Sequence, residues 1–151
     1  MYSKEEAQQI RHEFWHKLES KSRKVPGQNG KAIKWIGDKT GVKGLDLRFD
    51  VDREKAIVAL EINTNSEEKQ NAMWEKMNNC KALFEKNFGG PLVWERNYEK
   101  ASGEKVIRIY VETAGDLYNK DMWSDMLRFM IDNMIKLEKA FREVQDYLIH
   151  F

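Results

Sequence analysis

Three carboxylates in the first half of the chain have the chemistry and the spacing of a metal site. Asp46 and Asp50 lie in one strand-like stretch, and Glu61 lies in the next. Two carboxylates held close together can bind Mg²⁺, which activates a water molecule and stabilises developing charge on a phosphoryl group. Asp46, Asp50 and Glu61 are therefore the candidate catalytic residues, provided that neighbouring strands bring them together.

The residues that follow Glu61 weigh against hydrolysis. A restriction-nuclease core has the order α-β-β-β-α-β, with a metal-binding Asp on one central strand and Glu-x-Lys on the next. Here Glu61-Ile62-Asn63 places an amide where the lysine would stand, and an amide supplies neither a base nor a cation. We therefore expect a polar sheet face whose charge repulsion is relieved by Arg48 or Lys43, with a divergent nuclease as the alternative.

A second chemical pattern lies near the N-terminus, where His12 and His16 stand one helical turn apart with Glu13 between them. In zinc proteases such a pair of histidines binds Zn²⁺, and the Glu acts as the base. Phe14, however, falls on the apolar stripe of the predicted helix, so both histidines point to its outer face. No third histidine stands nearby to complete a catalytic zinc site. We expect two surface histidines and no bound metal.

Aromatic and basic residues gather along two later strand-like stretches, as in platforms that stack single-stranded nucleic acid. Basic side chains after the first helix would add phosphate contacts. The candidate nucleic-acid contacts are Arg96, Tyr98, Arg108 and Lys24. Aromatic residues on strands pack in cores more often than they bind bases, so this is the less favoured interpretation.

The composition limits the classes of protein to which this chain can belong. Its 26 Lys and Arg against 25 Asp and Glu give a net charge of +1, which argues against a domain-wide basic field for nucleic acid. The length and the 41% hydrophobic fraction fit one soluble domain over residues 1–151. A single cysteine, Cys80, excludes an internal disulfide. Since the N-terminal segment is charged and no apolar run reaches about 18 residues, we expect a cytoplasmic protein without a signal peptide or membrane span.

Two strand-like stretches form a predicted hairpin that would position the carboxylates. Apolar residues occupy the odd positions of residues 45–51 and the even positions of residues 56–62. Folding about a tight turn at residues 53–54 aligns four apolar pairs and buries one complete face. This register sets Asp46 directly opposite Glu61, and burial of the apolar face fixes it.

The remaining patterns predict an α+β fold with a mostly antiparallel, five-stranded sheet and helices packed on one of its faces. The expected order is α-β-β-β-α-β-β-α. We expect helices over residues 4–21, from a cap at residue 65 or 66 to residue 88, and from residue 123 onward, and strands over residues 32–36, 45–51, 56–62, 92–98 and 105–113. In the last hairpin, the best register sets Trp94 against Ile109 and makes an ion pair of Glu95 and Arg108.

The long last helix carries an apolar stripe with the spacing of a coiled-coil seam. The stripe begins at Trp123 and reaches the end of the chain. Two partners fit it: the first helix of the same chain, which we favour for most of the seam, or a second copy of the chain. Because only one other helix is long enough to cover the seam, we expect a homodimer through its overhanging end. The candidate dimer contacts are Phe141, Val144, Leu148 and Phe151.

Several motifs together resemble a known family. They are Phe14-Trp15 in the first helix, Leu83-Phe84-Glu85-Lys86 before Gly89-Gly90, Leu92-Val93-Trp94-Glu95-Arg96, Ile107-Arg108-Ile109, and Trp123 ahead of the long helix. Over nearly the whole chain, the sequence resembles the bacterial and archaeal family known as domain of unknown function 4268. The resemblance implies an association with nuclease-like domains in restriction or defence proteins, here as a stand-alone chain. It supplies no catalytic residue set.

We therefore expect a non-enzymatic interaction module whose partner is its own copy, a nucleic acid or a nuclease partner protein. The sequence contains no phosphate-binding loop, dinucleotide fingerprint or Ser/His/Asp set, so we expect no cofactor. The alternative is a divergent metal-dependent nuclease of the restriction type that uses Asp46 and Glu61.

Overall fold

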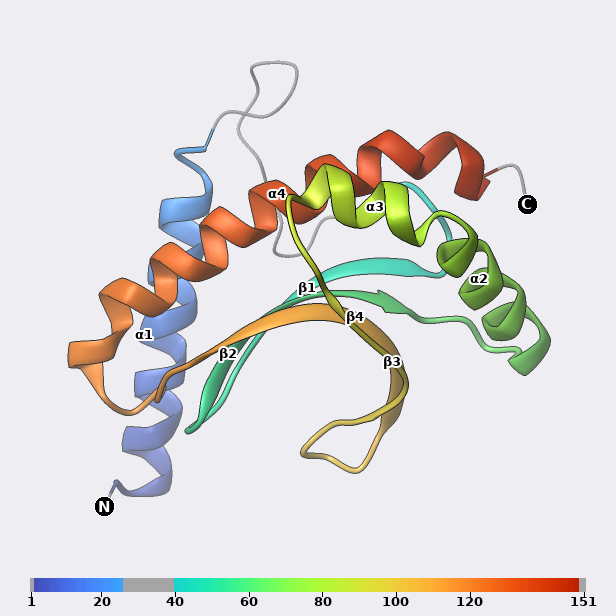
Figure 1. Ribbon diagram of the computed structural model, residues 1–151. Coiled ribbons are helices and arrows are strands. Elements are labelled where there is room, and N and C mark those ends of the chain that lie inside the picture. The colour runs from blue at the N-terminus through green and yellow to red at the C-terminus, as the bar shows by residue number, and fades with distance from the viewer. Residues whose placement is uncertain (1, 26–39, 150–151) are drawn as a thin grey trace.

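The fold combines one antiparallel sheet with helices that pack against it and against one another (Figure 1). The computed structural model describes residues 2–25 and 40–149. The helices are α1 (Lys4–Ser22), α2 (Glu67–Asn79), α3 (Lys81–Phe88) and α4 (Trp123–Ile149), with a 3-10 turn, η1, at Lys120–Met122. The strands are β1 (Leu45–Val51), β2 (Lys55–Ile62), β3 (Val93–Glu99) and β4 (Lys105–Ala114). The described elements form an α+β fold with the order α-β-β-α-α-β-β-α and the predicted long C-terminal helix.

The four strands lie in the order β1-β2-β4-β3, so β2 and β4 occupy the centre of the sheet. The register of the first hairpin is confirmed, because Phe49 lies opposite Val58 and Asp46 lies opposite Glu61. The side chain of Asp52 stabilises the turn by accepting the backbone N–H groups of residues 54 and 55 at 2.8 and 2.9 Å. The alternating apolar pattern thus fixes the alignment that brings the carboxylates together.

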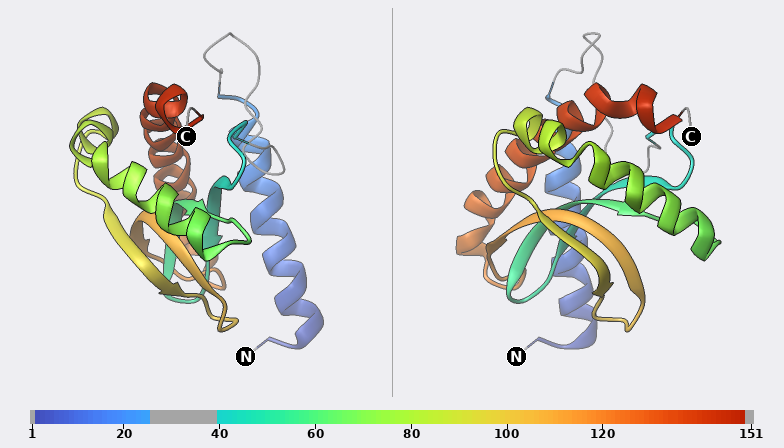
Figure 2. Two further views of the ribbon diagram at one scale, coloured as in Figure 1. Left: turned by 90° about the vertical axis from the view of Figure 1, so that its right-hand side faces the viewer. Right: turned by 45° about the vertical axis from the view of Figure 1, so that its right-hand side comes forward.

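One predicted element lies outside the described residues, and another needs correction. The strand expected at residues 32–36 lies outside the described residues, so the described sheet has four strands and not five. The helix expected to run unbroken to Phe88 is interrupted at Cys80, and its two parts, α2 and α3, meet at an angle (Figure 2). Cys80, at the interruption, is half-buried.

The interruption at Cys80 has a local cause. Its backbone N–H bonds to the carbonyls of both Lys76 and Met77, at 3.3 and 3.2 Å, so the last turn of α2 tightens and ends. Asn78 and Asn79, just before the break, have low intrinsic helix propensity. Both α2 and α3 still bury their apolar residues in the same core, so the apolar stripe alone could not reveal the break.

The helices form one layer over the apolar face of the sheet. In Figure 1, α4 runs across the sheet, with α3 beside it and α1 crossing near its first half. The ring of Phe14 on α1 meets the ring of Trp123 edge to face, with centroids 5.2 Å apart. The core between the sheet and the helices includes the fully buried Val58, Leu60, Phe84, Ile109, Met130 and Phe141. No helix of the described ranges has the length and apolar character needed to cross a membrane.

The second half of α4 is covered by the chain itself. Phe141, Val144 and Leu148 are buried, so the expectation that they form an exposed stripe is wrong; Phe151 lies outside the described residues. On one side, Lys76 of α2 donates to the Tyr147 carbonyl at 3.0 Å. On the other, Arg142 donates to the carbonyl of Thr40 at 2.6 Å, in the segment before β1. Self-association stays an untested prediction. Because Phe141, Val144 and Leu148 are buried within the chain, they are not available as its interface.

Replacing Trp123 by Ala should lower the free energy of unfolding by about 3–5 kcal/mol, as truncation of a core aromatic usually does. The side chain is 4% exposed, and its indole N–H donates to the Leu117 carbonyl at 2.7 Å. Urea denaturation measures the change. Trp123→Phe is the matched control, since it keeps an aromatic ring and should cost about 1 kcal/mol for the lost hydrogen bond. Equal midpoints for wild type and Trp123→Ala would contradict this account of the core.

Candidate functional site

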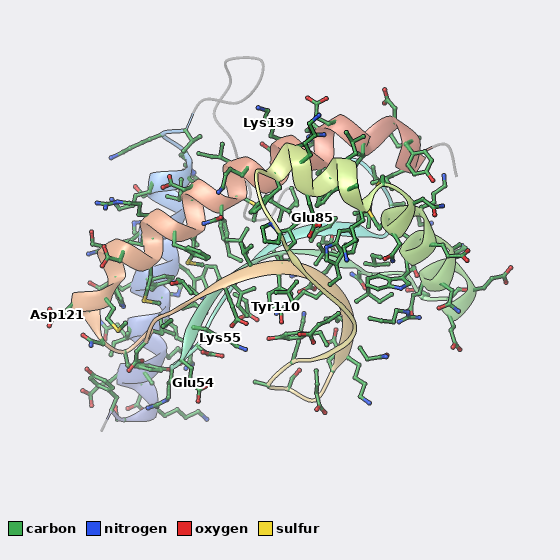
Figure 3. The ribbon with its side chains drawn as sticks, in the orientation of Figure 1. Glu54, Lys55, Glu85, Tyr110, Asp121 and Lys139 are labelled. Atoms are coloured by element: carbon green, nitrogen blue, oxygen red, sulfur yellow. The ribbon has the colours of Figure 1, made fainter. Side chains whose placement is uncertain are left out.

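The face of the sheet turned away from the helices is lined by charged and aromatic polar side chains. Alternate residues of a strand point to opposite faces, so the pattern that buries one face places these residues together on the other. The β3–β4 hairpin curls toward this side, and Figure 3 shows Lys55 and Tyr110 on it. We call it the polar face and define it by Asp46, Arg48, Asp50, Lys55, Glu61, Glu95, Tyr98, Lys100, Arg108, Tyr110 and Glu112.

A buried ion pair between Glu61 and Arg108 lies at the centre of the polar face. The two residues are directly opposite on the central strands, and they are only 2% and 1% exposed. The guanidinium donates to Glu61 Oε2 through Nε at 2.9 Å and also through Nη2. Its two terminal nitrogens lie 3.4 Å from Asp50 Oδ2. Burial alone would lower the pKa of Arg108, but Glu61 and Asp50 more than compensate, so its pKa is raised.

The ion pair predicted between Glu95 and Arg108 is wrong, although the predicted register is confirmed. Arg108 has a glutamate opposite it on each side, Glu61 on β2 and Glu95 on β3. It bonds to Glu61, and Glu95 instead accepts the Tyr110 hydroxyl at 2.5 Å.

The second oxygen of Glu61 is also held by cations of the chain. Glu61 Oε1 lies 3.2 Å from Lys100 Nζ and 3.4 Å from Arg48 Nε. Arg48 also lies 3.6 Å from Asp46, which accepts the Asn63 amide at 3.1 Å. The predicted relief of charge repulsion by Arg48 is thus confirmed. The contacts of Lys100 and Arg108 with Glu61 were not predicted, although a charged residue between Ile107 and Ile109 in an apolar strand is a signal for a buried partner.

The structure therefore brings Asp46, Asp50 and Glu61 to one face, but with cations between them. Asp46, Asp50 and Glu61 carry three negative charges, and Arg48, Lys100 and Arg108 carry three positive ones. A divalent ion at Glu61 would have to displace bound cations from both carboxylate oxygens, which like-charge repulsion opposes. Within the described ranges, no cluster of three or more His, Cys, Asp or Glu side chains is arranged to hold a metal ion.

Aromatic rings continue the polar face toward the hairpin. The Arg108 guanidinium lies 4.4 Å from the centre of the Tyr98 ring, which meets the Tyr110 ring edge to face. Burial, followed by the hydrogen bond to Glu95, raises the pKa of Tyr110 well above its ordinary value. Burial alone would lower the pKa of Lys55, but Tyr98 and Glu112 raise it above its ordinary value. The charged groups of this face are thus held in fixed positions by one another and by the tyrosines.

The two histidines lie where the helical pattern placed them. His12 and His16 are exposed on the outer side of α1, where with Trp15 they line a surface hollow of about 410 Å³. Glu19, on the rim of this hollow, forms an ion pair with Arg23. No third metal ligand accompanies the histidines among the described residues.

The four predicted nucleic-acid contacts do not share a surface. Arg108 is buried in its ion pairs, with the ring of Tyr98 against it. Arg96 turns toward the helices and donates to Asn71 of α2 at 2.7 Å. Lys24 lies beyond the end of α1, outside the sheet. Only Tyr98 and Arg108 of the four share the polar face, and nucleic-acid contact stays an untested prediction.

Comparison with known proteins gives a family and nothing beyond it. Residues 10–145 match the family described as Domain of unknown function (DUF4268), which confirms the resemblance drawn from the motifs. No curated protein and no solved structure matches the chain.

Removing either partner of the central ion pair should destabilise the protein by about 3–5 kcal/mol, because the other charge is left buried. The single variants are Glu61→Leu and Arg108→Met. The double variant should cost much less than the sum, since two apolar side chains replace the pair. Urea denaturation of all four proteins completes the double-mutant cycle. Additive costs would show that the two side chains do not act together.

The raised pKa of Tyr110 predicts a loss of stability at alkaline pH. Because its folded-state pKa lies above that of the unfolded chain, the protonated phenol contributes stability below pH about 10, and this contribution is lost as the pH rises through the folded-state pKa. The free energy of unfolding of the wild type should therefore fall more steeply above pH about 10 than that of Tyr110→Phe. Parallel pH profiles for the two proteins would refute this assignment.

Proposed function

We propose that the chain, which belongs to the family described as Domain of unknown function (DUF4268), acts as a non-enzymatic interaction module. The observation that carries the proposal is the complete pairing of the Glu61 carboxylate with cations of the chain. Both of its carboxylate oxygens are held by cations of the chain itself, Oε2 by Arg108 and Oε1 by Lys100 and Arg48. A carboxylate held in this way is suited to fixing the shape of a surface and poorly suited to coordinating a catalytic metal ion.

The polar face has the properties of a preorganised contact surface. The side chains of Arg48 and Asp50 are 50% and 46% exposed, so charged groups reach solvent from the rigid sheet that carries them. Their ion pairs fix them before any partner arrives, which lowers the entropic cost of binding. Charged groups in fixed positions select a partner with complementary charges. We infer that this surface takes another protein.

The kind of partner follows from the family resemblance. That resemblance implies association with nuclease-like domains, so we propose a partner within a nucleic-acid-processing or defence system. This step is an analogy at the level of the family.

One observation favours the alternative of a divergent metal-dependent nuclease. The register does bring Asp46 opposite Glu61, with Asp50 on the same face. This alternative requires that metal binding displace Lys100 and Arg108. Cleavage of DNA or RNA with Mg²⁺ or Mn²⁺, abolished by Asp46→Asn, would establish it and overturn the interaction module.

Capture of a partner by paired variants tests the proposal directly. Tagged wild type, purified from its native host, should retain a protein with nuclease activity. The double variant Asp46→Ala, Arg48→Ala removes the exposed Asp46–Arg48 ion pair, together with the Arg48 contact to Glu61, without changing the net charge, and it should lose that partner. The nuclease activity of the captured fraction is the measurement.

The control removes an equally exposed ion pair elsewhere. Glu13 and Lys120, 2.8 Å apart, join α1 to η1, and the double variant Glu13→Ala, Lys120→Ala also leaves the net charge unchanged. It should retain the partner. Equal capture by both double variants, or no nuclease activity in the wild-type fraction, would contradict the proposal. Thermal unfolding of both variants shows that they are folded.

A further inference from the structure

A polar hollow opens where β2 leaves the sheet. The pairing of β2 with β4 ends at Ile62 and Ile107, whereas β4 itself begins at Lys105. Beyond Ile62, the chain turns away toward α2, so the first residues of β4 have no β2 partner. The gap is a hollow of about 230 Å³, lined mainly by polar residues that include Asn63, Thr64, Gln70, Arg96, Asn97 and Lys105.

The hollow contains more positive than negative charge. Arg96 and Lys105 contribute two positive charges and Glu104 one negative charge, which leaves +1. Within the described ranges, no hydrogen bond or ion pair joins the side chain of Lys105 or Asn97 to another residue. Arg96 uses Nη2 to bond to Asn71, which fixes the guanidinium and leaves its other N–H groups for a further acceptor.

A bulge in β3 leaves Arg96 and Asn97 unpaired beside the hollow. The register of β3 with β4 shifts between Glu95 and Tyr98, so Arg96 and Asn97 have no paired residue on β4. A bulge redirects the side chains of the strand that carries it. Arg96 lies two residues after Trp94, so strand alternation places it on the helix-covered side, where it reaches Asn71 of α2; the bulge instead turns Tyr98 to the polar face.

The backbone supplies one more donor. Lys100 N–H bonds to the Glu104 carbonyl at 2.8 Å, and Gly115 N–H bonds to the Glu54 carbonyl at 2.9 Å. Hydrogen-bonding groups alternate along an antiparallel strand, so the even-numbered residues of β4 face β3 and the odd-numbered ones face β2. The Lys105 N–H therefore points to the side that β2 has left, toward the hollow.

Gln70 makes the wall of the hollow rigid. Its side-chain amide donates to the Thr64 carbonyl at 2.8 Å, and this bond ties α2 to the segment that leaves β2. The donors of Arg96, Asn97 and Lys105 thus surround a space whose walls are set by the fold.

We propose that this hollow is a binding site for a small oxyanion, a phosphate or carboxylate group. Arg96 and Lys105 supply the charge, and the Lys105 backbone N–H and the Asn97 amide supply hydrogen bonds. Drug-sized ligands occupy pockets of roughly 300–1,000 Å³, so the smaller hollow takes one such group and not a whole nucleotide. The inference does not rest on the proposed interaction through the polar face.

Titration with inorganic phosphate and, separately, with acetate, at constant ionic strength, tests the site. Amide resonances of the ¹⁵N-labelled protein are the readout, because the Lys105 N–H is itself a proposed donor. The resonances of Lys105 and Asn97 should shift and saturate with at least one of the two anions. The anion whose shifts saturate at the lower concentration shows whether the site prefers a phosphate or a carboxylate group. Linear, unsaturated shifts with both anions would overturn the proposal.

Two double variants with the same charge change separate the site from a general anion effect. Arg96→Gln, Lys105→Gln should weaken binding by more than about tenfold, because it removes two charged donors. Lys86→Gln, Lys139→Gln removes two exposed charges from α3 and α4 and should bind like the wild type. Equal weakening by both would overturn the proposal. If the first variant fails to fold, Asn97→Asp, which places a carboxylate in the hollow, should weaken binding in its place; unchanged binding would count against the site.

Discussion

The ion pair of Glu61 and Arg108 is the interaction on which the rest of the polar face depends. Both side chains belong to the central strands β2 and β4. The fixed backbone of these strands holds the two side chains in a buried position, away from solvent. An unpaired charge in such a position would be strongly destabilising, so the pair must be complete. Its completion draws in Lys100 from the β3–β4 hairpin and Asp50 from the edge strand β1. One buried contact thereby connects β1, β2 and β4 to the β3–β4 hairpin.

The same contact decides what the sheet can do chemically. Three acids that resemble a metal site in the sequence are neutralised by three cations, Arg48 of β1, Arg108 of β4 and Lys100 of the β3–β4 hairpin. Two cationic groups without an ion pair, Arg96 and Lys105, lie elsewhere in the described structure, at the end of the sheet where β2 departs and Arg96 bonds to α2. Within the described structure, the charge pairs form a rigid surface and the open hollow offers donors to an anion. The two regions have different chemistry because one is paired internally and the other is not.

The helix layer shows how packing divides a long apolar stripe between several partners. α1 meets the first half of α4 through Phe14 and Trp123, as the seam pattern favoured. The second half is buried by α3, by α2 and by the segment before β1, so no long partner helix is needed. The break at Cys80 contributes to this cover, since it lets α2 and α3 follow different directions over the sheet. An apolar stripe specifies that it must be buried, but it does not specify by what.

The sequence by itself determined the elements governed by local periodicity. The first hairpin, its register and the pair of Asp46 with Glu61 followed from alternation, because a shift of one residue would turn every apolar side chain to solvent. Strand order was not accessible in this way, so the sequence could not show that Arg108 has Glu61 on one side and Glu95 on the other. Only the tertiary structure decided between them, and it also brought Lys100 to Glu61 and covered Phe141 and Leu148. The physical reason is that burial constrains each strand or helix locally, whereas the choice among equally close charged partners depends on which segments the complete fold places side by side.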